Sequence, residues 1–536
     1  MRDYPLMESK IRGIEHELAM NTQPPLPHGS LVHLVGMAIE ELKKKGLVTR
    51  IKVEEDRLDF LALNGARVYN DMSHLEISSP SYNSPLEAVV YDKVTELLYY
   101  YAVEGLKKYY TEIHAYKNNI SNTSIRPDQW NAVSYSTHSS ILMDRTVCNP
   151  AIWPKLEVAL IPFIVARIPL IGCGDMVPAN KTGGYMSYGK RIGGDSLRYT
   201  ISPRAFFIRR TSSNDTVDAR GLLNQRDDPH ANPEKYWRLH DIHFEGLRSP
   251  FQIYLRDCLE VLTMTAYEKG YLKDAPRLKD PVNAVKEISG DTEVCNWKVV
   301  LDDGSKVDAI SDIMESFYLA GIEEMLDENA HNDTDRMGFN LIKATLDGLG
   351  SRRLEYFIDG LDWVTKKTLI DEYSENIEDV LGICNQYTLL DEGVLGFIGG
   401  DTGECHSTFD LKSGIQFAED AIPLVDWSSL GGRIKRALKY GPENTRGYLR
   451  SLVAREFPNF VKSVEWERVN FPRAIIQLQE PFRFNKEMCG DLAEHTETFS
   501  EFIQSIQRID KENKLVTHIP IEDHERLDKN QGGADI

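Results

Sequence analysis

The chain has 536 residues, of which 41% are hydrophobic and 27% charged, a composition typical of a globular protein with more than one folded unit. Its formal net charge of −20 argues against general binding to nucleic acid, where a basic surface supplies most of the affinity. No apolar run reaches the ~18–20 residues needed to cross a bilayer, and the N-terminus lacks the apolar centre of a signal peptide. Seven scattered cysteines without a Cys-x-x-Cys pair fit a reducing compartment, so we expect a cytoplasmic protein with no membrane or nucleic-acid partner.

The first predicted strand carries two carboxylates on one face. Residues 11–18 read Ile-Arg-Gly-Ile-Glu-His-Glu-Leu, and the period of two places Glu15 and Glu17 together, with Arg12 and His16 on the opposite face. Two neighbouring carboxylates repel each other unless a cation lies between them. Mg²⁺ accepts such ligands and leaves positions for water and phosphate, so the pair predicts a metal site, with an exposed strand as the alternative.

A second polar strand is predicted at residues 66–71. Its alternation places Arg67, Tyr69 and Asp71 on one face, and Glu76 follows where the chain must turn back. A cation for phosphate, an acid and a hard oxygen ligand form a set suited to magnesium-dependent phosphoryl chemistry. The alternative is an edge strand with a solvated polar face. Two acidic strands this close in sequence suggest one sheet that carries one metal site.

The later helices and strands are predicted from residues that typically begin or end such elements. Helical spacing ended by Gly46 predicts a helix over 31–45, and a Ser84-Pro85-Leu86-Glu87 capping box begins another that runs to about residue 110. Alternation predicts a hairpin over 195–210, and helical patterns cover 249–270, 311–329 and 355–373. Strands early and helices later predict an α+β fold.

A break in the helical pattern at residues 426–432, where Trp-Ser-Ser-Leu-Gly-Gly occurs, suggests a domain boundary. We expect a large catalytic domain at 1–428, a small C-terminal domain at 429–500 and a C-terminal extension at 501–536 that is partly disordered. Basic pairs and runs interrupt the acidic background, namely Arg209-Arg210, Arg352-Arg353, Lys366-Lys367 and residues 433–439. A solvated helix face is the default interpretation of the last run. If the partner is an acidic protein, any one of these patches could be its dock.

Several motifs in a fixed order resemble the Pup ligase and Pup deamidase/depupylase family, a branch of the glutamine-synthetase-like carboxylate–amine ligases. The resemblance runs from about residue 11 to about residue 485, and it rests on Gly-Ile-Glu-His-Glu (13–17), Asn-Gly-Ala-Arg-Val-Tyr-Asn-Asp (64–71), Ser-His-Leu-Glu (73–76), Tyr-Lys-Asn-Asn (116–119), Ser-Tyr-Ser-Thr-His (134–138), Ile-Ser-Pro-Arg-Ala (201–205), Asn-Gln-Arg-Asp-Asp-Pro-His-Ala (224–231), Arg-Leu-His (238–240), Asp-Trp-Val-Thr-Lys-Lys (362–367) and Val-Glu-Trp (464–466). It implies a glutamine-synthetase-like large domain with a curved, mainly antiparallel sheet packed by helices. It also implies ATP and Mg²⁺ as cofactors, and as partners a small acidic Pup-like modifier and lysine-bearing target proteins.

The resemblance also implies roles for individual residues. Asp71 would be the catalytic carboxylate. The metal ligands would be Glu15, Tyr69 and Glu76, with Glu17 and His240 beside them, and the nucleotide would contact Arg67, Ser79, Trp466, His138, Arg204 and Arg226. Without the family, a core tryptophan and satisfied structural histidines are the ordinary interpretations of Trp466, His138 and His240.

The direction of the reaction is left open by the sequence, and we favour an isopeptide-forming ligase. Between Glu15 and Asn64 the chain lacks the long inserted loop of the deamidase branch, and Gly-Ile-Glu-x-Glu is similar to the ligase. The five-residue step from Asp71 to Glu76 instead equals the deamidase spacing. The family usually has His-Glu-Asn where this chain has His138-Ser139-Ser140, which suggests a divergent substrate or metal geometry. A deamidase or depupylase, a small-molecule amide ligase and an inactive nucleotide-binding scaffold are the alternatives.

Overall fold

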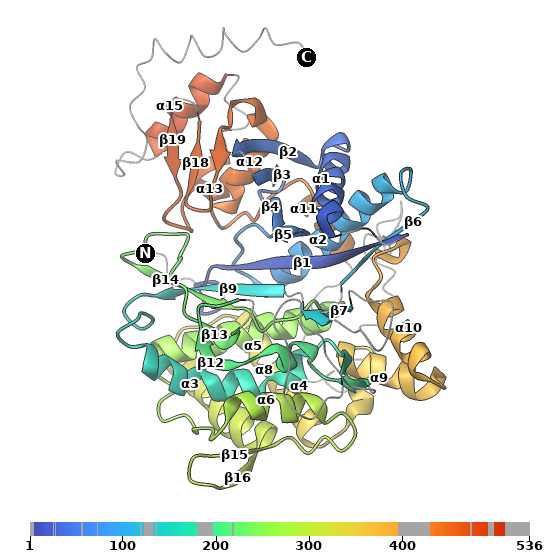
Figure 1. Ribbon diagram of the computed structural model, residues 1–536. Helices are drawn as coiled ribbons and strands as arrows, with labels where there is room; N and C mark the ends of the chain where they lie inside the picture. The colour runs from blue at the N-terminus through green and yellow to red at the C-terminus, as the bar shows by residue number, and fades with distance from the viewer. Residues whose placement is uncertain are drawn as a thin grey trace.

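The computed structural model describes residues 5–509, except for 25, 27, 55–56, 72, 118–119, 123–131, 135–136, 179–196, 217–218, 395–428, 472–473, 491 and 493–497. Within this part of the chain, ten strands form one sheet in the order β12-β13-β14-β9-β1-β5-β4-β3-β2, with β6 also paired to β1 (Figure 1). Neighbouring strands run antiparallel except for the parallel pair β12–β13. The strands are β1 Arg12–Gln23, β2 Val48–Glu54, β3 Arg57–Ala62, β4 Arg67–Asp71, β5 His74–Ser78, β6 Glu112–Tyr116, β9 Thr137–Asp144, β12 Arg210–Ser213, β13 Gly221–Asn224 and β14 Tyr236–Asp241.

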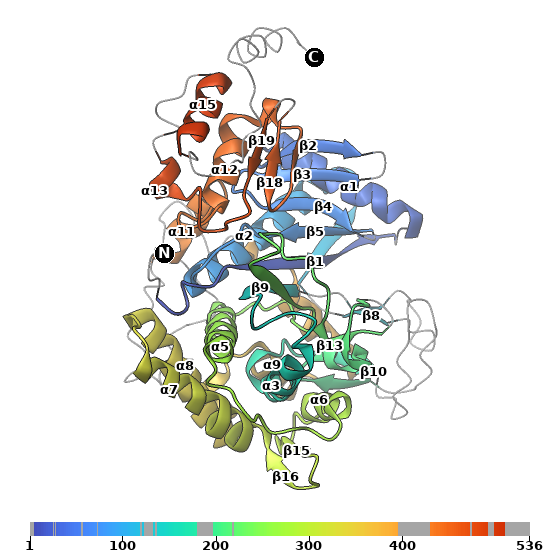
Figure 2. The same ribbon diagram turned by 90° about the vertical axis from the view of Figure 1, so that its left-hand side faces the viewer.

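One face of this sheet is covered by helices, and the other carries polar side chains. Along β1, Ile14, His16 and Leu18 are buried, whereas Glu15 and Glu17 between them are partly exposed. Helix α1 packs on β2, β4 and β5 and α2 on β1 and β6, and Figure 2 shows α3, α5 and α6 below β9. The helices of this large unit are α1 His28–Lys44, α2 Pro85–Leu106, α3 Trp153–Ala166, α4 Ile168–Ile171, α5 Pro250–Lys269, α6 Pro281–Gly290, α7 Ala320–Glu328, α8 Asp333–Gly350, α9 Asp362–Tyr373 and α10 Ile377–Thr388.

Short elements complete the large unit. A π-helix at Ala309–Leu319 leads into α7, and 3-10 turns lie at Pro203–Phe207 and Leu354–Phe357. Three two-stranded pairs lie outside the main sheet: β7 Ile120–Asn122 with β8 Ala132–Ser134, β10 Asp175–Pro178 with β11 Leu197–Thr200, and β15 Lys298–Val300 with β16 Lys306–Asp308.

A second hydrophobic core lies beside β2 and β3, at the top of Figure 1. It is built by α12 Gly447–Glu456, a 3-10 turn at Pro458–Phe460, strands β17 Ser463–Val464, β18 Arg468–Asn470 and β19 Ile475–Gln477, and helices α13 Lys486–Cys489 and α15 Phe499–Ile509. Leu61 of β3 joins this core, so the small unit packs directly on the edge of the large sheet. Helix α11 (Leu430–Ala437) instead packs on α2 and belongs to the large core. The two cores therefore meet between α11 and α12. Helix α15 begins two residues before the predicted extension 501–536 and covers its first residues, up to Ile509; residues 510–536 are outside the described residues.

The predicted α+β class is confirmed, and most predicted helices are present. Ser84 caps α2 by accepting a hydrogen bond from the Glu87 amide, the Glu87 carboxylate accepts one from the Asn83 amide, and the helix ends at Leu106. Gly270 ends α5 with a φ of 85°, as its position predicts. Within the described part of the chain, no helix is both long and apolar enough to span a membrane.

Two predicted elements are wrong. The segment 197–210 is not a hairpin, because the 3-10 turn that begins at Pro203 separates β11, which pairs with β10, from β12, which pairs with β13. Proline fixes its own φ and has no N–H to give to a ladder, which favours this turn. The helix predicted over 355–373 is interrupted, since the 3-10 turn at Leu354–Phe357 ends before α9 begins at Asp362.

Candidate active site

The strand register brings the predicted site residues onto the polar face of the sheet. Glu15 lies opposite Ser78 on one side and His138 on the other, and Ser78 pairs with Arg67. One step along, Glu17 lies opposite Glu76. Tyr69 also pairs with Glu76, so Arg67 and Tyr69 point to the same face as the carboxylates. The two acidic strands predicted from the sequence are therefore joined through β5.

Among the residues that the structure describes, two groups of three side chains on this face could each hold a cation. In each group the ligand atoms lie within 4.8 Å of one another: Glu15, His138 and His240 form one group, and Glu17, Asp71 and Glu76 form the other. Glu15 and Glu17 thus lie in separate candidate groups. The first set offers two nitrogens and a carboxylate, while the second offers only carboxylate oxygens, the type that Mg²⁺ prefers.

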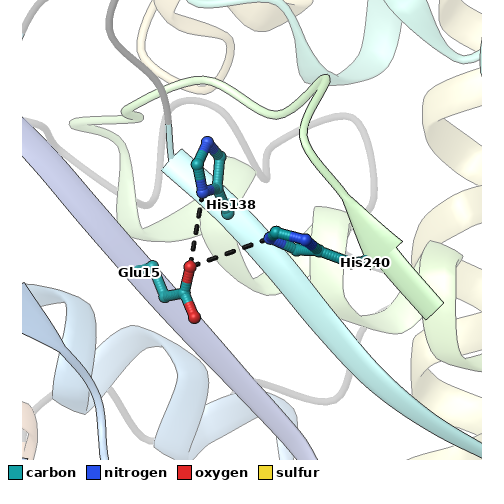
Figure 3. Close-up of side chains that lie close together, drawn as sticks. All are labelled: Glu15, His138 and His240. Carbon is teal, nitrogen blue, oxygen red and sulfur yellow. Dashed lines mark hydrogen bonds and ion pairs between the residues drawn. The ribbon is translucent and has the colours of Figure 1, made fainter. Parts of the chain in front are cut away.

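Figure 3 shows how the two imidazoles converge on Glu15 from neighbouring strands. His138 of β9 places Nδ1 3.3 Å from Oε2 of Glu15, and His240 of β14 places Nε2 3.7 Å from the same oxygen. Burial opposes ionisation of Glu15, but these imidazoles outweigh it and hold the pKa of the carboxyl well below its usual range. Burial, with help from nearby Arg238, lowers the pKa of His240 to about 4, so its ring is neutral at pH 7 and able to bind a metal.

The second group consists of three carboxylates, Glu17, Asp71 and Glu76, whose negative charges repel one another. Burial raises the pKa of Glu76 well above its usual value, and the charges of Glu15 and Glu17 add to this effect. The Tyr69 hydroxyl donates a hydrogen bond to Glu76, and the guanidinium of Arg67 stacks over the Tyr69 ring at 4.3 Å. Buried carboxylates that repel one another would be stabilised by a divalent cation, so the residues present fit one.

A pocket opens beside Glu15 at the boundary between the two cores. Its volume is about 470 Å³ including the open mouth, within the range of small-ligand sites. Ser79, after β5, and Trp466, between β17 and β18, both line it, and the resemblance assigns both to the nucleotide. Its walls also include the apolar side chains of Ile11, Leu142 and Pro229 and the polar ones of His230, Arg238 and Arg446.

The other residues predicted to bind the nucleotide, Arg67, His138, Arg204 and Arg226, are not among the described residues that line this pocket. Arg204 is fully buried, and its guanidinium donates hydrogen bonds to Ser134 and to the carbonyl of Ile242. Arg226 is exposed in the turn after β13 and is not among the described residues that line the pocket. Lys366, from one of the basic pairs, is likewise buried and donates to the carbonyl of Gly174, whereas Lys367 is partly exposed and pairs with Glu293 and Asp371. Arg204 and Lys366 therefore have structural contacts that account for their burial.

The Ser139-Ser140 departure has a simple geometric consequence. Because β9 alternates, Ser139 points away from the site and donates a hydrogen bond of 2.9 Å to Glu260 of α5 on the helical face. Ser140 points to the site, where it lines the pocket beside Arg238. The position where the family carries a glutamate is thus on the opposite face of the sheet from Glu15 and His240. The departure changes the support beneath the sheet rather than removing a ligand from these two groups.

Sequence reasoning missed two arginines of the pocket. Arg238 lies 3.5 Å from Glu15 and two residues before His240, so the period of two along β14 places both on one face. That signal was present in the Arg-Leu-His motif. Arg446 precedes α12 in the small unit, and only the packing of the two cores brings it to the pocket.

A carboxylate-rich sheet face thus lies beside a pocket between the two cores, and comparison with known proteins identifies the family. The family model described as Pup-ligase protein matches residues 26–382, so the chain belongs to this family. It is 27% identical over 457 residues to the depupylase of Acidothermus cellulolyticus, with 83% of this chain and 82% of the relative covered. It is 25% identical over 462 residues to the Pup deamidase/depupylase of Mycolicibacterium smegmatis, covering 84% and 83% of the two chains.

Two solved structures share the fold. The ligase PafA in complex with the prokaryotic ubiquitin-like protein Pup has a TM-score of 0.67 at 19% identity, covering 98% of this chain and 95% of that chain. The Pup ligase PafA in complex with ADP has a TM-score of 0.62 at 20% identity, covering 91% and 95%. The glutamine-synthetase-like fold expected from the motifs is thereby confirmed.

Proposed function

We propose that this protein is a magnesium- and ATP-dependent ligase that joins the C-terminal glutamate side chain of a small, acidic Pup-like modifier to a lysine of a target protein. The observation that carries the proposal is the position of Asp71. Asp71 belongs to the same candidate metal-binding group as Glu17 and Glu76. This group lies on the same sheet face as Glu15, and Glu15 lines the pocket together with Ser79 and Trp466. A reacting carboxylate and a nucleotide phosphate would therefore meet next to Asp71.

The residue types suit this reaction. A carboxylate is a poor acyl donor, so the γ-phosphoryl group of ATP is first transferred to it, which yields an acyl phosphate and ADP. Arg67, on the strand of Asp71, would lie against the phosphates, and a bound divalent cation would offset their negative charge. The lysine amine then attacks the acyl carbon and releases phosphate as the amide bond forms. Asp71 would accept the proton that the amine loses.

A second candidate is the reverse type of reaction, hydrolysis of the corresponding amide or isopeptide bond. It is favoured by the names of the two relatives, a depupylase and a Pup deamidase/depupylase, and by the spacing from Asp71 to Glu76. In this case Asp71 would attack the amide or activate water, and the nucleotide would not turn over. The lack of a long insertion between Glu15 and Asn64 leads us to place ligation first.

The two directions differ in nucleotide consumption. The experiment supplies a Pup-like protein in a Glu-ended and a Gln-ended form, with a lysine-bearing protein, and follows ADP release together with the mass of each product. Ligation predicts one ADP per isopeptide adduct from the Glu-ended form. Conversion of the Gln-ended form to the Glu-ended form without matching ADP would favour hydrolysis. If wild type changes neither form while Mg·ATP still binds, the carboxylate substrate is a different one.

A further inference from the structure

Two buried arginines lie at the junction of the two cores. Arg446 immediately precedes α12 and Arg450 follows one helical turn later, and their exposed fractions are 4% and 1%. Within the described part of the chain, no carboxylate forms an ion pair with either guanidinium. A buried charge without a counter-ion is unfavourable unless hydrogen bonds compensate it, and both arginines donate hydrogen bonds to main-chain carbonyls. Those carbonyls come from both cores.

Arg450 connects the strand of Arg67 to Trp466. Its Nε and Nη2 donate to the carbonyl of Gly65 at 3.2 and 3.1 Å, two residues before Arg67. Its Nη1 donates to the carbonyl of Glu465, and its guanidinium stacks on the ring of Trp466 at 4.4 Å. One side chain thus fixes both the backbone that leads into β4 and the aromatic ring that lines the pocket.

Arg446 makes a second connection on the other side of the pocket. Its Nη1 donates to the carbonyl of His230 at 2.6 Å and to the carbonyl of Leu478 at 2.7 Å. His230 lies in the loop between β13 and β14 and lines the pocket, whereas Leu478 belongs to the small core. The Nε of Arg446 is buried without a hydrogen-bond partner among the described residues, in a side chain that itself lines the pocket.

We infer that Arg446 and Arg450, together called the arginine clasp, attach the small core to the large unit and hold Trp466 in place against the nucleotide. Arg450 is a positioning residue: it acts through Trp466 and the Gly65 backbone, and it does not line the pocket itself. Arg446 adds a cation to the pocket wall. The inference rests on the proposed nucleotide binding and extends it, because it makes affinity for ATP depend on how the small core is attached.

The test measures Mg·ATP binding by calorimetry and the thermal unfolding midpoint of each variant. We expect Arg450→Met to weaken ATP binding roughly tenfold, the range of lost base–aromatic stacking. Arg450→Lys, which keeps a cation but neither the paired donors to Gly65 nor the flat stack, should weaken binding by an intermediate factor. The matched control is Arg455→Met in the last turn of α12, since this half-buried side chain pairs with Glu456 and stacks on Tyr440 away from the pocket.

A double variant separates positioning from general destabilisation. If Arg450 acts through Trp466, then Arg450→Met should weaken binding only slightly further in a Trp466→Ala background, so that the two effects are strongly non-additive. Full additivity, or wild-type ATP affinity in folded Arg450→Met and Arg450→Lys, would overturn the clasp and leave the proposed function standing. If wild type itself does not bind Mg·ATP, the ligase proposal and the clasp both fail. Should Arg450→Met not fold, Arg450→Lys and Arg446→Met provide the same comparison.

Discussion

Glu76 is the residue on which the negative charges of the site converge. It is nearly fully buried, lies opposite Glu17 and Tyr69 in the sheet, and feels the charges of both Glu15 and Glu17. Its pKa is raised well above the usual value, so the folded, metal-free protein holds a proton there that an unfolded glutamate releases. A raised pKa in the folded state contributes stability below the unfolded pKa of about 4.3, and this stability is lost as pH rises.

The first prediction joins pH and metal at Glu76. In a chelating buffer, the free energy of unfolding should fall as pH rises from about 5 to about 8, because the cluster must lose its proton. Mg²⁺ should restore stability, and more at pH 8 than at pH 5, because it replaces the proton as the counter-charge. Glu76→Gln should reduce the pH dependence, while other buried carboxyls such as Glu260 still contribute to it, and should remove most of the response to Mg²⁺. Urea unfolding at several pH values, with and without Mg²⁺, measures all three.

A matched control lies on the opposite face of the same sheet. Glu260 is equally buried and burial raises its pKa to about 8, but it accepts its hydrogen bond from Ser139 on the helical side. Glu260→Gln should therefore change the pH dependence of stability while leaving the response to Mg²⁺ intact. An equal Mg²⁺ response in wild type and Glu76→Gln at pH 8 would exclude Glu76 as a metal ligand.

The second prediction separates catalysis from binding at Asp71. Asp71→Asn keeps the size of the side chain and one ligand oxygen but cannot accept a proton. We expect kcat to fall roughly 10²- to 10⁴-fold, the usual loss for a general base, while the KM for Mg·ATP rises far less. Glu76→Gln should show the opposite emphasis, with KM more affected than kcat. A kcat for Asp71→Asn within a few-fold of wild type, from steady-state ADP or product release, would rule out a proton-accepting or nucleophilic role.

How well the sequence predicted the site depended on whether a residue's position follows from strand alternation alone. Glu15, Glu17, Arg67, Tyr69 and Asp71 lie on the predicted face because the period of two is a property of the backbone. The partners of each carboxylate come from strands β5, β9 and β14. The sequence therefore could not predict that Glu15 and Glu17 belong to different candidate metal-binding groups. Arg204 and Arg226 were expected to bind the nucleotide because they lie in family motifs. A motif carries no information on the direction of a side chain in a turn.

At the scale of elements, the joint between the β3–β4 turn and α12 depends on Gly65. Its φ is +88°, and an added Cβ would lie 3.1 Å from Cβ of Arg450 and 3.2 Å from the amide nitrogen of Ser451. Asn64 beside it donates to the carbonyl of Ala437 and accepts from the Ala66 amide. The Asn-Gly-Ala-Arg motif therefore does more than present Arg67, because it is also the surface on which the small unit docks.

The third prediction compares two glycines with the same backbone strain. Gly46, after α1, has a φ of +67° and no atom within 4 Å of an added Cβ. Gly46→Ala should reduce the free energy of unfolding by about 1 kcal/mol through left-handed strain alone. Gly65→Ala should reduce it by about 2–4 kcal/mol, because α12 must also move, and should weaken ATP binding with it. Urea unfolding and calorimetry test both; equal losses in the two variants would show that the contact with α12 is unimportant.

Helices whose ends are set by local capping residues were predicted well. Strands whose pairing depends on segments distant in sequence were not. Helix α5 begins after Ser249 and ends at Gly270, since a cap and a left-handed glycine are local chemistry. The pairing of β11 and β12 depends on β10 and β13, which no short-range pattern identifies. In the same way, α11 belongs to the large core because Leu430, Ile434 and Ala437 pack there, next to α2. The break in the helical sequence pattern at residues 426–432 instead suggests that a new domain begins at this point.

At the scale of the whole molecule, the net charge of −20 bears on how the proposed partner arrives. The modifier we propose is itself acidic, so the two proteins repel at long range before any local contact forms. Salt screens this repulsion, since the Debye length is about 10 Å at 0.1 M and about 30 Å at 0.01 M. The association rate should therefore rise with ionic strength, the reverse of the trend for oppositely charged partners.

The last prediction measures this dependence with a labelled Pup-like protein in stopped flow. Between about 10 mM and about 100 mM salt we expect the association rate constant to rise several-fold, while the dissociation rate changes less, because long-range charge acts mainly on encounter. A rate that falls with salt would mean that a local basic surface guides the modifier. The exposed cations Arg433, Lys435, Arg436 and Lys439 on and after α11 are the first surface to test in that case. Lys435→Glu should then slow association, whereas under the repulsion that we expect it should have little effect beyond its added charge.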